Sequence, residues 1–266
     1  MRVIIIIFLS IIAISFFAGC EHFQEKDAVS PIPAEELYNQ AMEQYRSKNY
    51  IDAYELFQQC RSRYPISDWG VKAELKMADS LYYQNQYETA FIQYQEFSRL
   101  HPTHRFIDYV HYQMGMCSYK QIGSIDRDQT FTEKAIKQFE TLIALFPSSP
   151  YAPSARKKIE KCKKDLLEHI LYIADFYTRT NAYNSALYRY IEALQNYRDY
   201  VPSPDRLMFQ IGKLCLRVNE LAKARDQFIV LLKEYPDSSF APLAENMLED
   251  PQKASEIDDL QLLTKD

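Results

Sequence analysis

The chain has 266 residues, with 31 basic and 36 acidic side chains and a formal net charge of −5. Its length is sufficient for one or two domains with a hydrophobic core, and its 47% hydrophobic content excludes a wholly disordered chain. The negative charge argues against a nucleic-acid-binding protein, because such proteins gain most of their affinity from Lys and Arg on phosphates. Only five glycines are present, and neither a Gly-x-Gly-x-x-Gly nor a Walker sequence occurs, which disfavours nucleotide-binding α/β enzymes.

Residues 1–19 have the features of a signal peptide for export. Arg2 precedes an apolar run from Val3 to Gly19, and small residues precede the expected cleavage site. A transmembrane anchor is the alternative, because a run of this length lies at the lower limit for spanning a bilayer.

The end of this run favours a lipoprotein. Residues 17–20, Phe-Ala-Gly-Cys, resemble the lipobox of bacterial lipoproteins, in which the cysteine is acylated and becomes the first mature residue. We therefore predict that acyl chains on Cys20 anchor the protein to a membrane. By the same resemblance, Glu21 at the next position favours the outer membrane. Residues 20–33 are polar with two prolines and are predicted to be a tether.

A repeated pattern fills residues 34–248. An alanine is followed four residues later by an aromatic residue at Ala53–Phe57, Ala90–Tyr94, Ala135–Phe139, Ala186–Tyr190 and Ala224–Phe228. Small residues let two antiparallel helices approach closely, the aromatic ring fills the wedge beside them, and a following proline ends the second helix. This pattern is that of the tetratricopeptide repeat and predicts an all-α, right-handed superhelical solenoid of about five repeats, with a concave binding face. The predicted repeats are 34–65, 69–102, 105–147, 154–202 and 205–236.

Two units depart from the pattern. The third carries an insertion around Asp126, Arg127 and Asp128, which we predict to be an exposed loop. The fourth opens with an apolar stripe that predicts one continuous helix over about 154–178. Its outer face is basic, and is either a solvated surface or a docking patch for an acidic partner or lipid head groups. The basic residues are Arg156, Lys157, Lys158, Lys161, Lys163 and Lys164.

Residues 249–266 are expected to form either a cap on the solenoid or a frayed tail.

Cysteines and histidines do not predict a metal or redox centre. The cysteines of the repeats fall at apolar helix positions without any Cys-x-x-Cys, so we predict small core residues. They are Cys60, Cys117, Cys162 and Cys215. Three histidines close in sequence flank a turn and give no fixed ligand geometry, so no metal site is expected. They are His101, His104 and His111.

Tyrosines are concentrated on the first helices of the first three units. Most are expected to pack between helices and a minority to be exposed on the concave face, where tyrosine suits the binding of extended peptides. They are Tyr38, Tyr45, Tyr82, Tyr83, Tyr109 and Tyr112.

These features together resemble the BamD family, the tetratricopeptide lipoproteins of the outer-membrane β-barrel assembly machine. The lipid-anchored start, the five repeats, the third-unit insertion, the long helix and residues 174–189 carry the resemblance. It implies a scaffold that is not an enzyme, has no cofactor and lies on the periplasmic face of the outer membrane.

The resemblance also implies partners. They are the Omp85-class insertase of the BamA type, other assembly-complex lipoproteins and unfolded outer-membrane protein precursors. Arg189 is then expected to pair with a carboxylate of the insertase, and Asp126, Arg127 and Asp128 to order their loop or contact a partner. The alternative is a tetratricopeptide lipoprotein that acts as a pilotin or as a cell-envelope assembly adaptor.

Overall fold

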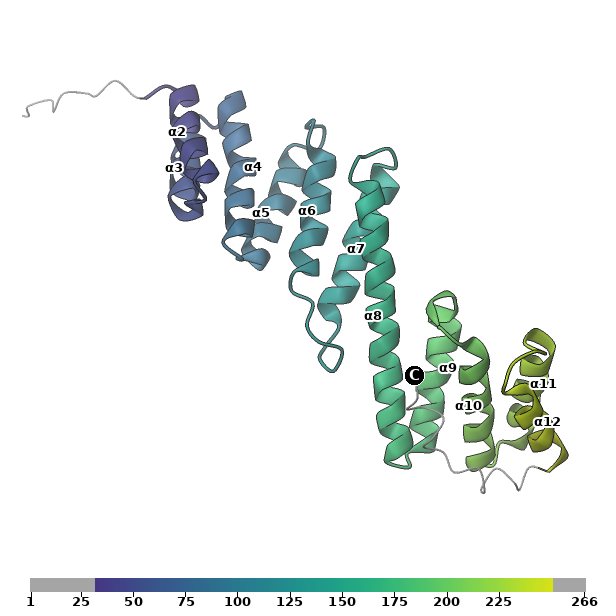
Figure 1. Cartoon of the computed structure of the whole chain (residues 1–266). Helices are drawn as coiled ribbons and strands as arrows, with labels where there is room; N and C mark the ends of the chain where they lie inside the picture. Colours follow the sequence, from purple (N-terminus) through teal and green to yellow (C-terminus); the bar gives the residue numbers. More distant parts are fainter. Residues whose placement is uncertain (1–31, 251–266) are drawn as a thin grey trace, which may run out of the picture.

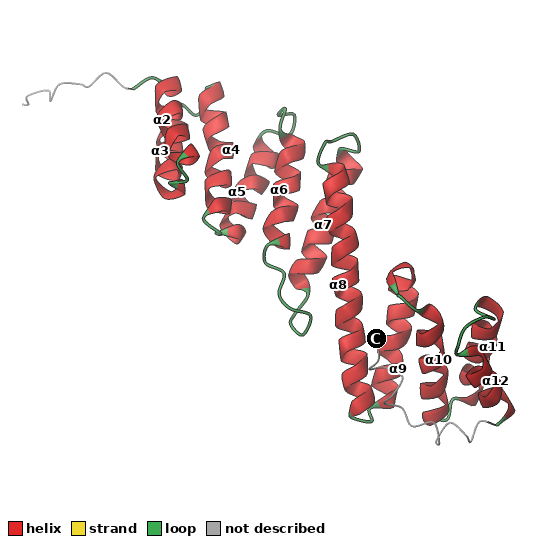
Figure 2. Cartoon of the chain, viewed as in Figure 1, coloured by secondary structure: helices red, strands yellow, loops and turns green. Residues whose placement is uncertain are grey.

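The protein is an elongated stack of helical hairpins (Figure 1). The computed structural model describes residues 32–250, in which every regular element is helical (Figure 2). The predicted signal peptide, Cys20 and most of the predicted tether lie outside this range. The helices of the described part are α2 (Ala34–Arg46), α3 (Tyr50–Arg63), α4 (Asp68–Tyr83), α5 (Tyr87–Leu100), α6 (Ile107–Tyr119), α7 (Thr130–Leu145), α8 (Ala152–Arg179), α9 (Tyr183–Tyr197), the short 3-10 helix η1 (Arg198–Tyr200), α10 (Pro204–Arg217), α11 (Leu221–Glu234) and α12 (Ala241–Glu249).

Small residues and aromatic rings hold each hairpin together, as the repeat pattern predicts. The repeated alanines and the rings that follow them are at most 2% exposed in all five units. In two units the partner of the ring is a glycine. A Cβ added to Gly115 would lie 2.5 Å from Cε1 of Phe139, and one added to Gly212 would lie 2.3 Å from Cε1 of Phe228. The helical-solenoid prediction is confirmed.

Four of the hairpins turn through the same backbone conformation. Lys48, Asn85, Asn181 and Asn219 have positive φ angles of 64°, 61°, 60° and 62° at the turns between the paired helices. Asn tolerates this left-handed region better than most residues, because its side chain can form local hydrogen bonds. The third unit has the insertion in place of this turn.

Helix α8 belongs to two hydrophobic cores at once. Its first half packs Ala155, Ile159 and Cys162 against α7 in the core of the third unit. Its second half places Ile170 and Ala174 in the core formed with α9 to α12. The long apolar stripe therefore joins the first three units to the last two (Figure 1).

The end of the solenoid contains a helix that the repeat pattern did not predict. Helix α12 buries Ala241, Ala244 and Met247 against the last hairpin. The predicted cap or tail, 249–266, lies outside the described residues except for its first two.

All four cysteines of the described part are buried and free, which confirms that they are core residues. Burial raises the pKa of Cys117 to about 12 and that of Cys162 to about 11. The thiols are therefore protonated at neutral pH and poor nucleophiles.

Candidate functional site: the faces of a helical scaffold

A buried carboxylate joins α4, α5 and α6 of the second and third units. Asp79 on α4 is fully buried and accepts hydrogen bonds from the hydroxyls of Tyr94 (2.6 Å) and Tyr109 (2.8 Å). Lys76 Nζ lies 2.7 Å from its other oxygen, and Gln113 donates to the Tyr109 hydroxyl. Burial raises the pKa of Tyr94 and Tyr109 far above the usual range, so both act as hydrogen-bond donors.

The buried Asp79 was not predicted from the sequence, although the sequence contains a pattern that indicates it. In the second and fourth units the repeated ring is a tyrosine, and an Asp follows the small residue of the first helix. Asp175 accordingly accepts a hydrogen bond from Tyr190. In the other three units the ring is Phe, and no Asp follows the small residue.

Of the six tyrosines predicted to line the first three units, Tyr83 is exposed, at 46%. Its ring stacks on that of Tyr50, with centroids 5.0 Å apart, and meets the edge of Tyr45 at 5.9 Å. Lys76 Nζ lies 4.8 Å from the centre of the Tyr45 ring. Tyr45, Tyr50 and Tyr83, here called the aromatic cluster, therefore form a surface of three rings beside a cation. The other five predicted tyrosines are buried or partly buried, as expected for most of the set.

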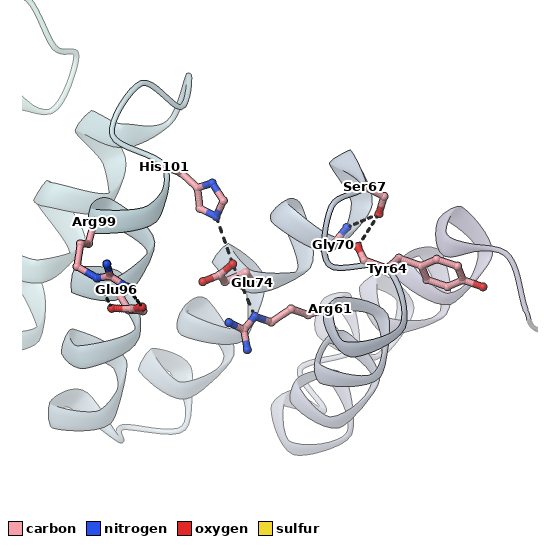
Figure 3. A network of polar contacts seen from close by, with 8 residues as sticks. All are labelled: Arg61, Tyr64, Ser67, Gly70, Glu74, Glu96, Arg99 and His101. Atoms are coloured by element: carbon pink, nitrogen blue, oxygen red, sulfur yellow. Dashed lines mark hydrogen bonds and ion pairs between the residues drawn. The ribbon is translucent and has the colours of Figure 1, made fainter.

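A second buried carboxylate joins the outer edges of the first two units (Figure 3). Glu74 on α4 is 7% exposed and lies 3.7 Å from Nε of Arg61 on α3 and 3.3 Å from Nε2 of His101 after α5. Each partner comes from a different helix or turn, so this contact fixes the angle between the two units. His101 has a structural partner here. Within residues 32–250 no group of three or more His, Cys, Asp or Glu side chains is placed to hold a metal ion.

The predicted loop residues are all at the surface. Asp126, Arg127 and Asp128 lie exposed in the connection between α6 and α7. A hydrogen bond with the Ser124 side chain lowers the pKa of Asp126, and one with Thr130 lowers that of Asp128. Both carboxylates are therefore charged and open to solvent.

The loop has a defined shape that comes from neighbouring residues. Gln129 Nε2 donates to the carbonyl oxygens of Ser124 (3.1 Å) and Arg127 (3.0 Å). Nδ1 of His169 on α8 lies 2.5 Å from the carbonyl oxygen of Ile125, which ties the loop to the long helix. The insertion is thus an ordered projection beside α8.

Arg189 lies elsewhere, on α9. Its Nη1 lies 2.8 Å from Oε2 of Glu192 on the same helix, and its guanidinium carbon lies 5.6 Å from the centre of the Tyr188 ring. The Arg189 side chain is 35% exposed, and Tyr188 is 66% exposed. No hydrogen bond or ion pair joins Arg189 to the loop residues in the described part of the chain. A surface pair of this kind contributes little, so the guanidinium can exchange Glu192 for a partner's carboxylate.

The basic face of α8 is largely neutralised. Lys161 pairs with Asp165, Lys164 with Glu160, and Lys163 with Glu140 of α7. Lys158 lies over the Tyr119 ring, with Nζ 4.2 Å from its centre, and burial lowers its pKa. Arg156 and Lys157 remain exposed. These local partners favour the solvated-surface alternative for most of this face.

Comparison with known proteins identifies the family of the chain. The profile of the YfiO family, described as outer membrane lipoprotein, matches residues 31–217, which is more than half of the chain. The chain belongs to the YfiO family. The match ends at the last residue of α10, so α11 and α12 lie outside the YfiO match.

Curated relatives of this chain include outer membrane protein assembly factors. The outer membrane protein assembly factor BamD of Vibrio cholerae is 28% identical over 211 residues, covering 76% of this chain and 87% of the relative. The protein of the same name from Pasteurella multocida is 29% identical over 222 residues, covering 79% and 85%. The predicted resemblance to the BamD family is confirmed. Among solved structures, the TPR2AB domain of yeast Sti1 is similar with a TM-score of 0.42 and 13% identity, covering 84% of this chain and 87% of that one.

None of the helices between residues 32 and 250 is both long and apolar enough to cross a membrane. Helix α8 has 28 residues, but charged side chains recur along it.

Proposed function

We propose that this member of the YfiO family is a non-catalytic outer-membrane protein assembly factor. It docks an Omp85-class insertase and helps to deliver or insert unfolded outer-membrane β-barrel proteins. The observation that carries this proposal is the family match over residues 31–217, together with curated relatives described as outer membrane protein assembly factor BamD.

The solenoid is suited to holding two partners at a fixed separation. Repeat solenoids present long surfaces on which separate sites can lie. Because α8 is buried in the cores on both sides of it, a partner bound to the first three units keeps a defined position relative to one bound to the last two.

The anchor is proposed to be the acylated Cys20, followed by the tether 20–33. Several acyl chains, each contributing about 0.8 kcal/mol per buried CH2, hold a protein to a bilayer almost permanently. The solenoid is proposed to lie on the periplasmic face of the outer membrane. Mass spectrometry of the mature protein is expected to find acyl chains on Cys20, and a Cys20→Ser variant is expected to lack them.

The two ends of the solenoid are proposed to have different partners. In the first units, the aromatic cluster Tyr45, Tyr50 and Tyr83 offers flat, partly polar rings suited to extended chains of varied sequence. In the fourth unit, Arg189 is proposed to meet a carboxylate of the insertase. Asp126, Arg127 and Asp128 project beside α8 between these two regions and are proposed to contact a partner there.

The experiment is a pull-down of the intact lipoprotein from its native membranes in gentle detergent, with mass spectrometry of the bound proteins. Recovery of an Omp85-class barrel in near-equal amount supports the proposal. Recovery of a secretin or of cell-wall synthases instead would contradict it and favour a pilotin or an envelope adaptor. Arg189→Glu is expected to reduce recovery of the barrel, whereas Arg225→Glu, on the exposed surface of α11, is the matched control.

A further inference from the structure

The turns between the first three units form a surface that the proposed function does not use. The turns that join one unit to the next lie along one edge of the solenoid (Figure 1). The α3–α4 and α5–α6 turns adjoin there, because Glu74 contacts Arg61 beside the first turn and His101 in the second (Figure 3). Residues 61–72 and 99–106, which include these two turns, are here called the basic edge.

The basic edge is positively charged in a chain that is negatively charged overall. Its two ranges contain five basic side chains and one acidic side chain, whereas the net charge of the chain is −5. Two of the five cations pair with neighbouring carboxylates. The other three, Arg63, Lys72 and Arg105, are exposed and form no ion pair within the described part of the chain. These three side chains can therefore bind an anionic surface.

Exposed apolar side chains accompany these cations. Ile66 is 96% exposed, and Phe106 is 40% exposed. Lys72 Nζ lies 4.1 Å from the centre of the Trp69 ring, and the guanidinium carbon of Arg105 lies 4.3 Å from the centre of the Phe106 ring. Cations, aromatic rings and an aliphatic side chain on one surface are the combination that proteins use at the headgroup region of a bilayer.

The cations of the two turns act on the same place. Burial lowers the pKa of His104, and the charges of His101, Arg105 and Lys72 lower it further. Arg105 belongs to the same turn as His104, whereas Lys72 belongs to α4. Because both cations influence one imidazole, they are close enough to contact a single ligand surface together.

The described chain begins at this edge. The hydroxyl of Tyr64, in the α3–α4 turn, donates a hydrogen bond to the carbonyl oxygen of Ile32 over 2.7 Å. Twelve residues separate Ile32 from Cys20, so the proposed acyl anchor lies at most about 43 Å from Ile32, at 3.6 Å per residue. The basic edge is therefore held near the bilayer in which the acyl chains of Cys20 would lie.

The later turns of the same edge lack free cations. Residues 146–151 and 235–240 contain no basic side chain. Arg198, between α9 and α10, is paired with Glu234. Unpaired positive charge is thus confined to the turns nearest the predicted tether, which favours a partner that is brought there by the anchor.

We propose that the basic edge binds the anionic headgroup surface of the bilayer that holds the acyl chains of Cys20. The proposal rests on the lipid anchor of the proposed function. Acidic phospholipids supply phosphates for the three cations, and Ile66 and Phe106 enter the headgroup region. Tethering raises the local concentration of the bilayer surface, so a small patch is sufficient for contact.

This orientation leaves the aromatic cluster free to bind a protein. Tyr83 is the last residue of α4, whereas Asp68, its first residue, belongs to the basic edge. The 16 residues of α4 extend about 24 Å at 1.5 Å per residue. With the basic edge on the bilayer, the aromatic cluster faces away from the membrane.

The test measures contact between position 66 and the bilayer in the chain from Cys20 to its end. The chain is produced without acylation and coupled through Cys20 to a maleimide lipid, so the result does not depend on acylation in the cell. A fluorescent apolar amino acid replaces Ile66. The vesicles contain phosphatidylethanolamine, phosphatidylglycerol and a lipid with a nitroxide on its headgroup, which quenches nearby fluorophores.

We expect strong quenching at position 66. The same probe at Thr89, an exposed position in the first turn of α5 at the opposite edge, is expected to show little quenching. Equal quenching at the two positions, or none at position 66, would overturn the proposal.

Charge removal tests the chemistry of the contact. Lys72→Gln combined with Arg105→Gln is expected to lower the equilibrium constant for contact about 30-fold, because each Lys or Arg near an anionic surface contributes a factor of about five. Replacing phosphatidylglycerol by phosphatidylcholine is expected to reduce the quenching as well. Circular dichroism checks that the double variant keeps its fold.

The matched control removes two exposed cations from the basic face of α8. Arg156→Gln combined with Lys157→Gln is expected to leave the quenching at position 66 unchanged. An equal loss in the two double variants, or quenching that is independent of anionic lipid, would contradict a specific basic edge. Recovery of the insertase in the pull-down is a separate measurement, so a failure of the bilayer contact and a failure of the assembly function are distinguishable.

Discussion

The hydroxyl of Tyr94 donates a hydrogen bond to the buried carboxylate of Asp79 over 2.6 Å, and the two residues are 15 positions apart in the chain. In the fourth unit the hydroxyl of Tyr190 makes the same contact with Asp175, and these residues are also 15 positions apart in the chain. The ring fills the wedge between helices in every unit, but in these two units it also carries a polar atom into the core. An Asp one position after the small residue supplies the required acceptor.

Replacing Asp79 is predicted to lower the free energy of unfolding. Asp79→Leu leaves the Tyr94 and Tyr109 hydroxyls without their acceptor, and we expect a loss of about 3 kcal/mol in the free energy of unfolding. Asp79→Asn keeps a hydrogen-bond acceptor, so it is expected to lower the free energy of unfolding by less than Asp79→Leu does. Urea unfolding followed by circular dichroism measures both. The control is Asp226→Asn on the exposed side of α11, and an equal effect of Leu and Asn at position 79 would contradict this account.

A methyl group at Gly115 is predicted to destabilise the third unit. Gly115→Ala places a Cβ 2.5 Å from Cε1 of Phe139, so the ring has to shift within a packed core. We expect a net loss of about 1–2 kcal/mol in the free energy of unfolding, because the cost of overpacking the core outweighs the better helix propensity of Ala.

A second substitution tests the cause of that loss. Phe139→Leu removes the clashing ring atoms. The double variant with Gly115→Ala is therefore expected to lose less free energy of unfolding than the sum of the losses in the two single variants. Gly123→Ala is the control, since its added Cβ would lie 3.4 Å from a flexible Arg127 side chain. Additive losses measured by chemical denaturation would show that the clash is not the cause.

The repeat pattern predicted the hairpins because their spacing is set by local contacts between alanines and rings. It also predicted the long first helix of the fourth unit, since the apolar stripe continues through α8 without a break. It could not predict α12, because nine residues without a repeat partner form a helix only by packing Ala244 and Met247 on the previous hairpin. The Asp79 contact was missed because the pairing of a Tyr ring with an Asp after the small residue occurs in only two units, and the Glu74 contact because its partners Arg61 and His101 lie far from it in the chain. The positions of Arg189 and of the loop residues were predicted as surface positions, but their distance from each other depends on how the units stack.

Gln129 is predicted to control the shape of the third-unit loop. Its Nε2 donates to two loop carbonyls, and its Oε1 accepts a hydrogen bond from Thr132 over 2.7 Å. Gln129→Ala removes all three contacts at the start of α7. We expect faster proteolytic cleavage within residues 123–128 with little change in the melting temperature, because the loss is local. Thr141→Ala, on the exposed side of α7, is the control, and unchanged cleavage of Gln129→Ala would show that the loop is held by other contacts.

The buried thiols are predicted to resist alkylation in the folded protein. Burial raises the pKa of Cys117 to about 12 and that of Cys162 to about 11, so only about one thiol in a thousand or fewer is ionised at pH 8. The labelling rate is expected to rise about tenfold per pH unit below these values, since thiolate is the reactive form.

Mass spectrometry after iodoacetamide treatment measures this labelling in a Cys20→Ser chain, which retains the four buried cysteines. In native buffer at pH 8 we expect none of the four to be modified within an hour, and in concentrated urea all of them. Adding Ser124→Cys in the exposed loop provides an internal control that is expected to react at once. Rapid native labelling of Cys117 would show that the second and third units open frequently, because that thiol is fully enclosed between α6 and its neighbours.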